Sequence, residues 1–157
     1  MSSHAFSQIY LHITFHTKDN RPVIGGEVES RLYDYLRTRA LESPGVEVHA
    51  VGGIEDHIHL AVRIPPTLLV SDWIGDLKGA SSWHINHRVK PKTLQWQEGY
   101  GVVSFGKRSL AEVIHYINHQ RVHHQRGSTH SGRERITTEE PVPTARAQSA
   151  TRKKKAR

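Results

Sequence analysis

Residues 55–64 read EDHIHLAVRI, and this stretch is the first indication of both a sheet and a polar site. Side chains on a strand alternate between the two faces, so His57 and His59 point the same way, about 6–7 Å apart at the backbone. The opposite face is apolar and suits a core: Ile58, Leu60, Val62 and Ile64. Two imidazoles on one face of a rigid strand can bind a single metal ion.

The elements before this strand follow from the spacing of apolar residues. Apolar and polar residues alternate over 9–16, which predicts a half-buried strand. Apolar residues at fourfold spacing predict a helix over 27–42. A second strand is predicted over 46–51, and Gly52-Gly53 is predicted to turn the chain into an antiparallel hairpin with a loop of about five residues.

Two helices and one strand are predicted after the His-Ile-His strand. We expect a helix over 71–88, with its first residue, a serine, as the N-cap. Residues 100–105 predict a short fourth strand. A last helix is predicted over 109–125, again with a serine at its start, and Gly127 is its natural stop.

The resulting order of elements is β-α-β-β-α-β-α, which predicts an α+β fold. A split β-α-β repeat of this kind gives the ferredoxin-like (RRM-like) arrangement, a four-stranded antiparallel sheet with helices on one face. The last helix falls outside the repeat and is free to lie elsewhere. We therefore expect one domain over 1–126, followed by a basic tail over 127–157 that lacks periodicity and is predicted to be disordered.

Composition narrows the function classes. The chain has 157 residues and no cysteine, which excludes disulfides and thiolate metal sites. No apolar run approaches the roughly 20 residues of a membrane span, and no signal peptide is apparent, so a cytoplasmic protein with no membrane partner is expected. Of the formal charge of +7, eight Lys/Arg against three Glu in 127–157 supply +5. That tail suits non-specific phosphate contact, or is simply a solvated end.

The last predicted helix presents a phenol and an amide together. Tyr116 lies to one side of the apolar stripe, and Gln120 follows one turn later on the same face. A phenol can attack an electrophile, and an amide oxygen can bind a hard cation. Taken alone, Tyr116 would be read as an ordinary interfacial aromatic residue.

Four motifs in order resemble the HUH (histidine, hydrophobe, histidine) single-tyrosine transposases of small insertion sequences, the TnpA type, with their REP-associated tyrosine transposase relatives. The motifs are LHITFHTKDNRPV at 11–23, DHIHL at 56–60, LKGASS at 77–82, and the Tyr116/Gln120 pair. Asp19-Asn20 departs from the aromatic and Arg that are common in the first motif of the family. The resemblance covers about residues 8–125.

The resemblance implies an enzyme that cleaves and rejoins single-stranded DNA carrying hairpins. His57, His59 and Gln120 would hold one divalent ion, Mg²⁺ or Mn²⁺, and Tyr116 would attack phosphorus to form a 5′-phosphotyrosine. It also implies a homodimer with active sites shared between subunits. Asp56 is either an acceptor that orients His57 or a plain turn residue.

Further candidates for DNA contact are basic or histidine residues near these motifs: Lys18, Arg21, Lys78, His119 and His123. For Lys78, an ordinary solvated lysine on a helix is an equal alternative. The aligned residues His115, His119 and His123 could form a solvated helix face, or they could supply a proton relay or a different metal ligand. Two other functions stay open. One is a domesticated protein that binds or nicks hairpins in chromosomal repeats, and the other is a zinc hydrolase that would not need Tyr116.

Overall fold

The computed structural model describes residues 5–127 and residue 129. The elements within them are β1 (Ile9–His16), η1 (Lys18–Asn20), α1 (Glu27–Leu41), β2 (Glu47–Ile54), β3 (His57–Ile64), α2 (Val70–Arg88), β4 (Gly101–Phe105), η2 (Lys107–Ser109), α3 (Leu110–Asn118) and α4 (Gln120–Arg126). The strands form one antiparallel sheet in the order β2-β3-β1-β4. This order confirms the predicted ferredoxin-like fold; nearly all of the predicted tail lies outside the described residues.

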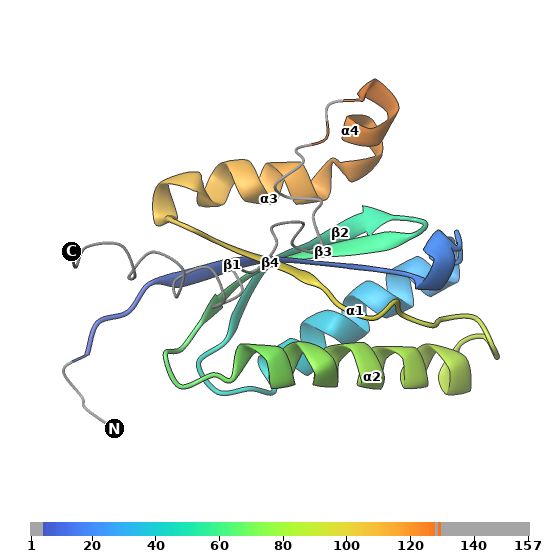
Figure 1. Ribbon diagram of the computed structural model, residues 1–157, viewed down its shortest axis with the longest axis horizontal. Helices are drawn as coiled ribbons and strands as arrows, with labels where there is room; N and C mark the ends of the chain where they lie inside the picture. Colours follow the sequence, from blue (N-terminus) through green and yellow to red (C-terminus); the bar gives the residue numbers. More distant parts are fainter. Residues whose placement is uncertain (1–4, 128, 130–157) are drawn as a thin grey trace, which may run out of the picture.

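The sheet lies between two layers of helices (Figure 1). Helices α1 and α2 cover one face, and the main hydrophobic core fills the space between them and the sheet. Its strand residues include Ile58, Leu60 and Val62, the apolar side of the His-Ile-His strand, as predicted. Helices α3 and α4 lie over the opposite face. No helix of the described residues is long and apolar enough to cross a membrane.

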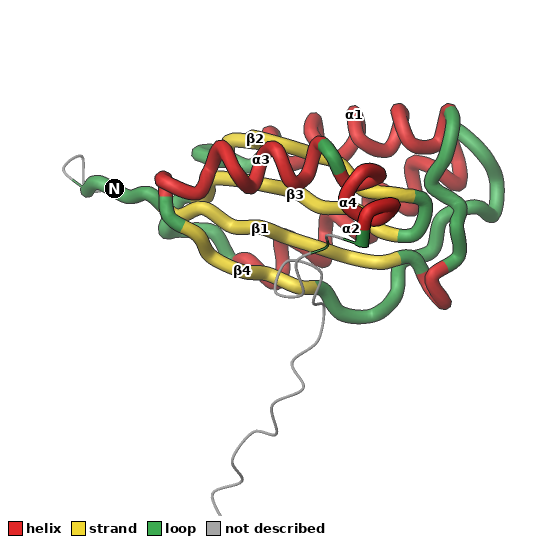
Figure 2. Tube along the Cα trace, turned by 90° about the horizontal axis from the view of Figure 1, so that it is seen from above, coloured by secondary structure: helices red, strands yellow, loops and turns green. Residues whose placement is uncertain are grey.

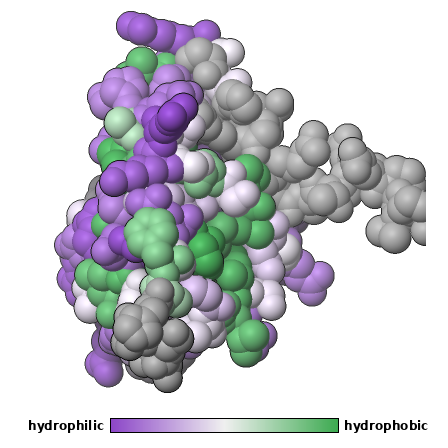
Figure 3. Space-filling view, turned by 90° about the vertical axis from the view of Figure 1, so that its left-hand side faces the viewer, coloured by the Kyte–Doolittle hydropathy of each residue, from purple (hydrophilic) through white to green (hydrophobic). Residues whose placement is uncertain are grey.

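Helix α3 covers only part of its face of the sheet. It contacts β2 and β3, whereas β4 forms the uncovered edge (Figure 2). Val102 and Val103 of that edge strand are exposed. Two further apolar residues are exposed: Phe6 lies shortly before β1, and Leu69 directly precedes α2. Figure 3 shows one side of the molecule, where hydrophobic surface lies among hydrophilic surface.

The prediction that β1 is half-buried is wrong, because both of its faces are covered. Tyr10, His12 and Thr14 alternate with the core residues and are themselves buried. The cause is the last helical segment, which places Tyr116 against His12 on the second face. In β1, therefore, the alternation of polar and apolar residues distinguishes two buried faces of the sheet. It does not distinguish a buried face from a face exposed to water.

The predicted turn at Gly52-Gly53 is also wrong. Both glycines lie within β2, and Ile54 pairs directly with His57, so the hairpin turns at Glu55-Asp56. A Cβ atom on Gly52 would clash with the carbonyl oxygen of Ile117 in α3. Glycine is required at this position because the backbone of a helix approaches the strand too closely for any side chain.

Two helix boundaries differ from the prediction. Helix α2 begins at Val70, one residue before the serine expected to cap it, and no side chain caps its start. The last predicted helix is two helices, because His119 has non-helical dihedral angles (φ −117°, ψ 30°) and separates α3 from α4. The predicted stop at Gly127 is confirmed by its left-handed φ of 64°.

We predict that Gly52→Ala destabilises the fold by about 1–3 kcal/mol, because the added methyl group forces α3 away from β2. Gly79→Ala is the matched control. Gly79 is an exposed residue of α2 with open space around it, so alanine there should stabilise the helix by about 1 kcal/mol. Urea unfolding of both variants checks this, and an unchanged midpoint for Gly52→Ala would show that α3 is not held as described.

Candidate active site

The paired histidines lie on the face of the sheet that α3 covers. In the antiparallel register of β1 and β3, Thr14 stands opposite His59 and His16 stands opposite His57. The polar side chains of β1 therefore share a face with the histidine pair. The rings of His57 and His59 are 5.0 Å apart between centroids, so the prediction that they point the same way is confirmed.

Tyr116 reaches this face from α3. It is 4% exposed, and its ring centroid lies 5.9 Å from that of His59 and 4.8 Å from that of His123. The apolar residues that seat the helix are few: Ala50, Ala61, Val113 and Ile117. The phenol and the histidine pair are thus brought together within one chain.

Gln120 lies beside Tyr116, although not in the manner predicted. It opens α4 instead of continuing the helix of Tyr116, and its amide nitrogen donates a 3.0 Å hydrogen bond to the carbonyl oxygen of Tyr116. The side chain is 1% exposed, and its Oε1 atom has no hydrogen-bond partner in the part of the chain that the structure describes. A buried acceptor without a donor is costly, which suits an oxygen that binds a cation.

Each histidine of the pair is held by a different kind of neighbour. The Nδ1 atom of His57 donates to the Asp56 carboxylate at 2.6 Å, so Asp56 orients the ring as well as forming the turn. The Nδ1 atom of His59 lies 2.9 Å from Nε2 of His12 and 3.0 Å from the hydroxyl oxygen of Thr14. In both rings Nε2 is the nitrogen that would bind a metal ion.

The donors present fit a divalent cation. Imidazole nitrogens suit transition metals, and an amide oxygen suits harder ions, so two histidines with one glutamine form a mixed set. The described residues contain no group of three or more His, Cys, Asp or Glu side chains placed to hold a metal. A set that includes an amide is not of that kind, so His57, His59 and Gln120 stay a prediction.

Sequence reasoning missed several histidines around this set. His12 contacts His59 and Tyr116, His16 stacks on His57 with centroids 4.7 Å apart, and His124 of α4 lies 4.9 Å from His57. The signal was available in part, because His12 and His16 occupy alternate positions of β1. Only the register of β1 against β3 tells which residues they meet.

Two of the predicted DNA contacts are on or between the helices that carry Tyr116 and Gln120. His123 packs on Tyr116, and the exposed His119 stacks on His115 with centroids 4.0 Å apart while bonding to the His115 carbonyl oxygen. His119 is also the residue at which the helix breaks.

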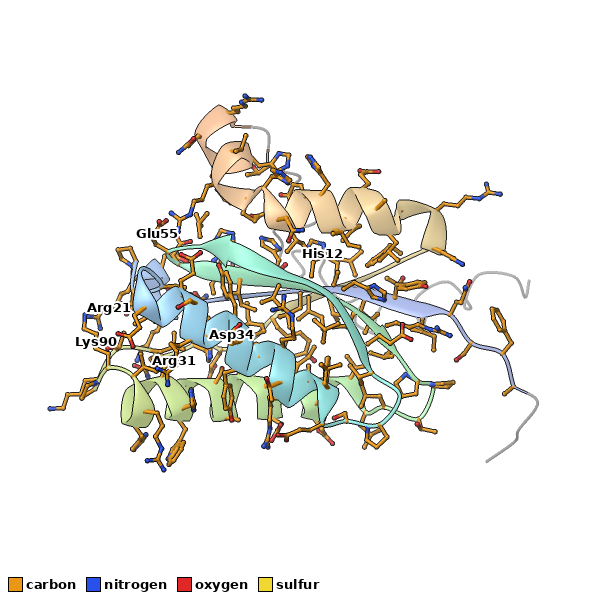
Figure 4. The ribbon with its side chains drawn as sticks, turned by 180° about the vertical axis from the view of Figure 1, so that it is seen from behind. His12, Arg21, Arg31, Asp34, Glu55 and Lys90 are labelled. Carbon is orange, nitrogen blue, oxygen red and sulfur yellow. The ribbon has the colours of Figure 1, made fainter. Side chains whose placement is uncertain are left out.

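The other three lie elsewhere. Lys18 and Arg21 are exposed on and beside η1, the segment directly after β1, and Figure 4 shows Arg21 at the same end of the molecule as Glu55. Lys78 lines a cleft of about 490 Å³ together with Arg21 and Trp96. Its ammonium donates to the carbonyl oxygens of Gln97 and Gly99, each at 2.7 Å, and burial lowers the pKa of Lys78. Lys78 is therefore a half-buried lysine, on the helix layer across the sheet from Tyr116, and its contact with DNA stays a prediction.

Arg121 ties α4 to the rest of the fold. Its guanidinium bonds to Glu55 in the β2–β3 turn and, at 2.6 Å, to Glu29 of α1. Hydrogen bonding from its own backbone N–H, and then from Arg121, lowers the pKa of Glu55. The pairing connects the turn that carries Asp56 with the helix that carries Gln120.

Comparison with known proteins gives the family. Residues 5–120 match the family model described as "Transposase IS200 like", and the chain belongs to that family. It is 32% identical over 115 residues to "Transposase for insertion sequence element IS200" of Salmonella typhimurium, covering 69% of this chain and 74% of that protein. It is 29% identical over 119 residues to "ISDra2 transposase TnpA" of Deinococcus radiodurans, covering 72% and 84%. Its class of activity is therefore DNA transposition and recombination.

Solved structures agree on the fold. A crystal structure of a putative transposase from Deinococcus radiodurans superposes with a TM-score of 0.61 at 25% identity, covering 76% of this chain and 96% of that one. A REP-associated tyrosine transposase bound to a REP hairpin superposes with a TM-score of 0.57 at 16% identity, covering 79% and 74%. The second likeness concerns the fold alone.

We predict that Arg121→Gln lowers the free energy of unfolding by about 0.5–1 kcal/mol at pH 7, because it removes two ion pairs. Arg126→Gln is the control, since Arg126 is an exposed residue of the same helix. The folded pKa of Glu55 is depressed, so its contribution is fully present above about pH 4.3 and is lost as the pH falls through the lower folded value. The difference between wild type and Arg121→Gln should thus shrink in acid. Urea melts at pH 7 and pH 3 measure it, and a constant difference would contradict the assignment.

Proposed function

We propose that this transposase cleaves and rejoins single-stranded DNA at hairpin-marked ends through a covalent phosphotyrosine. The observation that supports it most is the convergence of Tyr116, His59 and Gln120, all nearly fully buried, on one face of the sheet. A nucleophile beside a candidate cation site is the combination that phosphoryl transfer requires.

Tyr116 would act as the nucleophile. Its Oη atom forms a bond to the scissile phosphorus while the bond from phosphorus to the 3′ oxygen breaks. The phenol loses its proton, and the departing oxygen gains one to become a free 3′-hydroxyl. The product is a 5′-phosphotyrosine, and rejoining reverses each change with a second 3′-hydroxyl. Because one phosphodiester is exchanged for another, no nucleotide cofactor is needed.

His57, His59 and Gln120 would hold a divalent cation, Mg²⁺ or Mn²⁺. When bound, such an ion polarises the phosphate and stabilises the charge that develops on it. Asp56 keeps the ring of His57 in place through its 2.6 Å hydrogen bond. The rings of His59 and His123 pack against Tyr116, and such packing would limit the access of water to a covalent intermediate.

Hairpin DNA as the partner is supported by the solved relative that carries a REP hairpin. Exposed Lys18, Arg21 and His119 are the residues of this chain proposed to contact the DNA backbone. We further propose a homodimer that shares its active sites. In the single chain α3 packs on its own sheet, so sharing requires the same helix face to pack on the sheet of a second copy.

The relative bound to a REP hairpin also favours a second function, that of a domesticated protein that nicks hairpins in chromosomal repeats. The chemistry of cleavage would be the same in both cases. Hairpins at matched distances on both sides of the gene would favour a mobile element, and their absence would favour the domesticated protein.

We predict that Tyr116→Phe abolishes the covalent adduct with a labelled single strand from the flanks of the gene, because phenylalanine lacks the attacking oxygen. Hairpin binding should persist. Tyr35→Phe is the control, since Tyr35 stacks on His84 of α2, on the other side of the sheet. Denaturing gels of the reaction measure the adduct, and its survival in Tyr116→Phe would reject the nucleophile.

We predict that EDTA prevents adduct formation and that Mn²⁺ restores it at lower concentration than Mg²⁺, because two of the three protein donors are imidazoles. Gln120→Leu should raise the concentration of Mn²⁺ needed for half-maximal adduct, whereas Gln125→Leu, on the exposed side of α4, should not. The same gel assay with a metal titration measures this. Full adduct formation in EDTA would exclude the metal site.

A further inference from the structure

His12 is a buried histidine that the proposed chemistry does not use. It lies in the middle of β1, is 3% exposed, and its ring is 5.0 Å from that of His59 and 6.2 Å from that of Tyr116. Figure 4 shows it on the side of the sheet that faces α3. Burying an imidazole in a core position costs free energy unless its polar atoms are bonded, so a specific contact is expected.

That contact is made with Nδ1 of His59, the ring nitrogen that would not bind the proposed cation. Nε2 of His12 is 2.9 Å and the hydroxyl oxygen of Thr14 is 3.0 Å from the same Nδ1 atom. An imidazole that binds a metal through Nε2 is neutral and carries its proton on Nδ1. That N–H must donate to an acceptor, because a buried donor left without one is costly.

We propose, building on the function proposed above, that His12 is a positioning residue for the cation site. Its unprotonated Nε2 accepts the hydrogen bond from Nδ1–H of His59, with Thr14 as a second contact to the same atom. This fixes His59 in the tautomer and rotation that turn Nε2 toward the cation. His12 then does for His59 what Asp56 does for His57, with a neutral imidazole in place of a carboxylate.

The two orienting groups differ in kind because of where they lie. Asp56 is in the β2–β3 turn and is partly exposed, so its side chain remains within reach of water. His12 lies under α3, where an isolated carboxylate would be strongly disfavoured. At the buried position of His12, a neutral hydrogen-bond acceptor costs less free energy than a charged one.

Two variants separate positioning from space filling. His12→Phe keeps a ring and removes the acceptor. His12→Gln restores an acceptor at the end of a side chain of similar reach, so it should rescue what phenylalanine loses. Thr14→Val removes only the second contact and should have the smaller effect.

The first measurement needs no metal. The full chain is labelled with ¹⁵N-histidine, and the signals of His59 are assigned by their loss in His59→Gln. We expect His59 to carry its proton on Nδ1 in wild type and in His12→Gln, and to populate the Nε2–H form in His12→Phe. An Nε2–H tautomer in the wild-type chain would overturn the proposal, whether or not His12→Phe folds.

The second measurement is Mn²⁺ affinity by electron paramagnetic resonance on the same full-length chains. We expect His12→Phe to bind about 10–100-fold more weakly, and His12→Gln to stay close to wild type. A folded His12→Phe with wild-type affinity would overturn the proposal. Wild type that binds no Mn²⁺ would instead refute the cation site of the proposed function, while the tautomer of His59 would still decide the contact with His12.

Discussion

The contact between Gly52 of β2 and the backbone of Ile117 in α3 is the constraint on which the site depends. The absence of a side chain at one strand position lets a helix lie directly on the sheet. That approach closes the second face, buries the histidines of β1 and β3, and brings Tyr116 within 5.9 Å of His59 between ring centroids. The apolar contact that supports it is small, so geometry matters more here than buried area.

The fold was predictable because its pattern is local. Alternation in the strands and fourfold spacing in α1 reflect one large core, and that core is read directly from the sequence. The predictions are wrong where a segment distant in the sequence determines the local structure or the burial of a strand. Gly52-Gly53 resembles a turn until α3 is placed beside it, and β1 seems half-buried until Tyr116 covers His12. Neither contact leaves a periodic trace in the sequence.

The sequence indicates which side chains of the candidate site lie near one another, but not the contacts that connect them. The rings of His57, His59 and Tyr116 lie close together as the motifs indicate, and Gln120 bonds to the backbone of Tyr116 from a separate helix. The role of His12 could not be predicted, because His12 and His59 are 47 positions apart in the sequence. Only the register of β1 against β3 brings their side chains into contact. Lys78 also has contacts that the motif does not reveal, because its ammonium donates to two backbone carbonyl groups at the edge of a cleft.

The deep burial of the phenol bears on when this enzyme is reactive. With Tyr116 4% and Gln120 1% exposed, the proposed attack on a phosphodiester would require the rings and helices around these side chains to move. The ion pairs of Arg121 that hold α4 are partly exposed, and pairs of this kind contribute little to stability, so they would oppose such a movement only weakly. If Tyr116 is the nucleophile, its burial would limit adduct formation to DNA that binds well enough to displace the groups covering it.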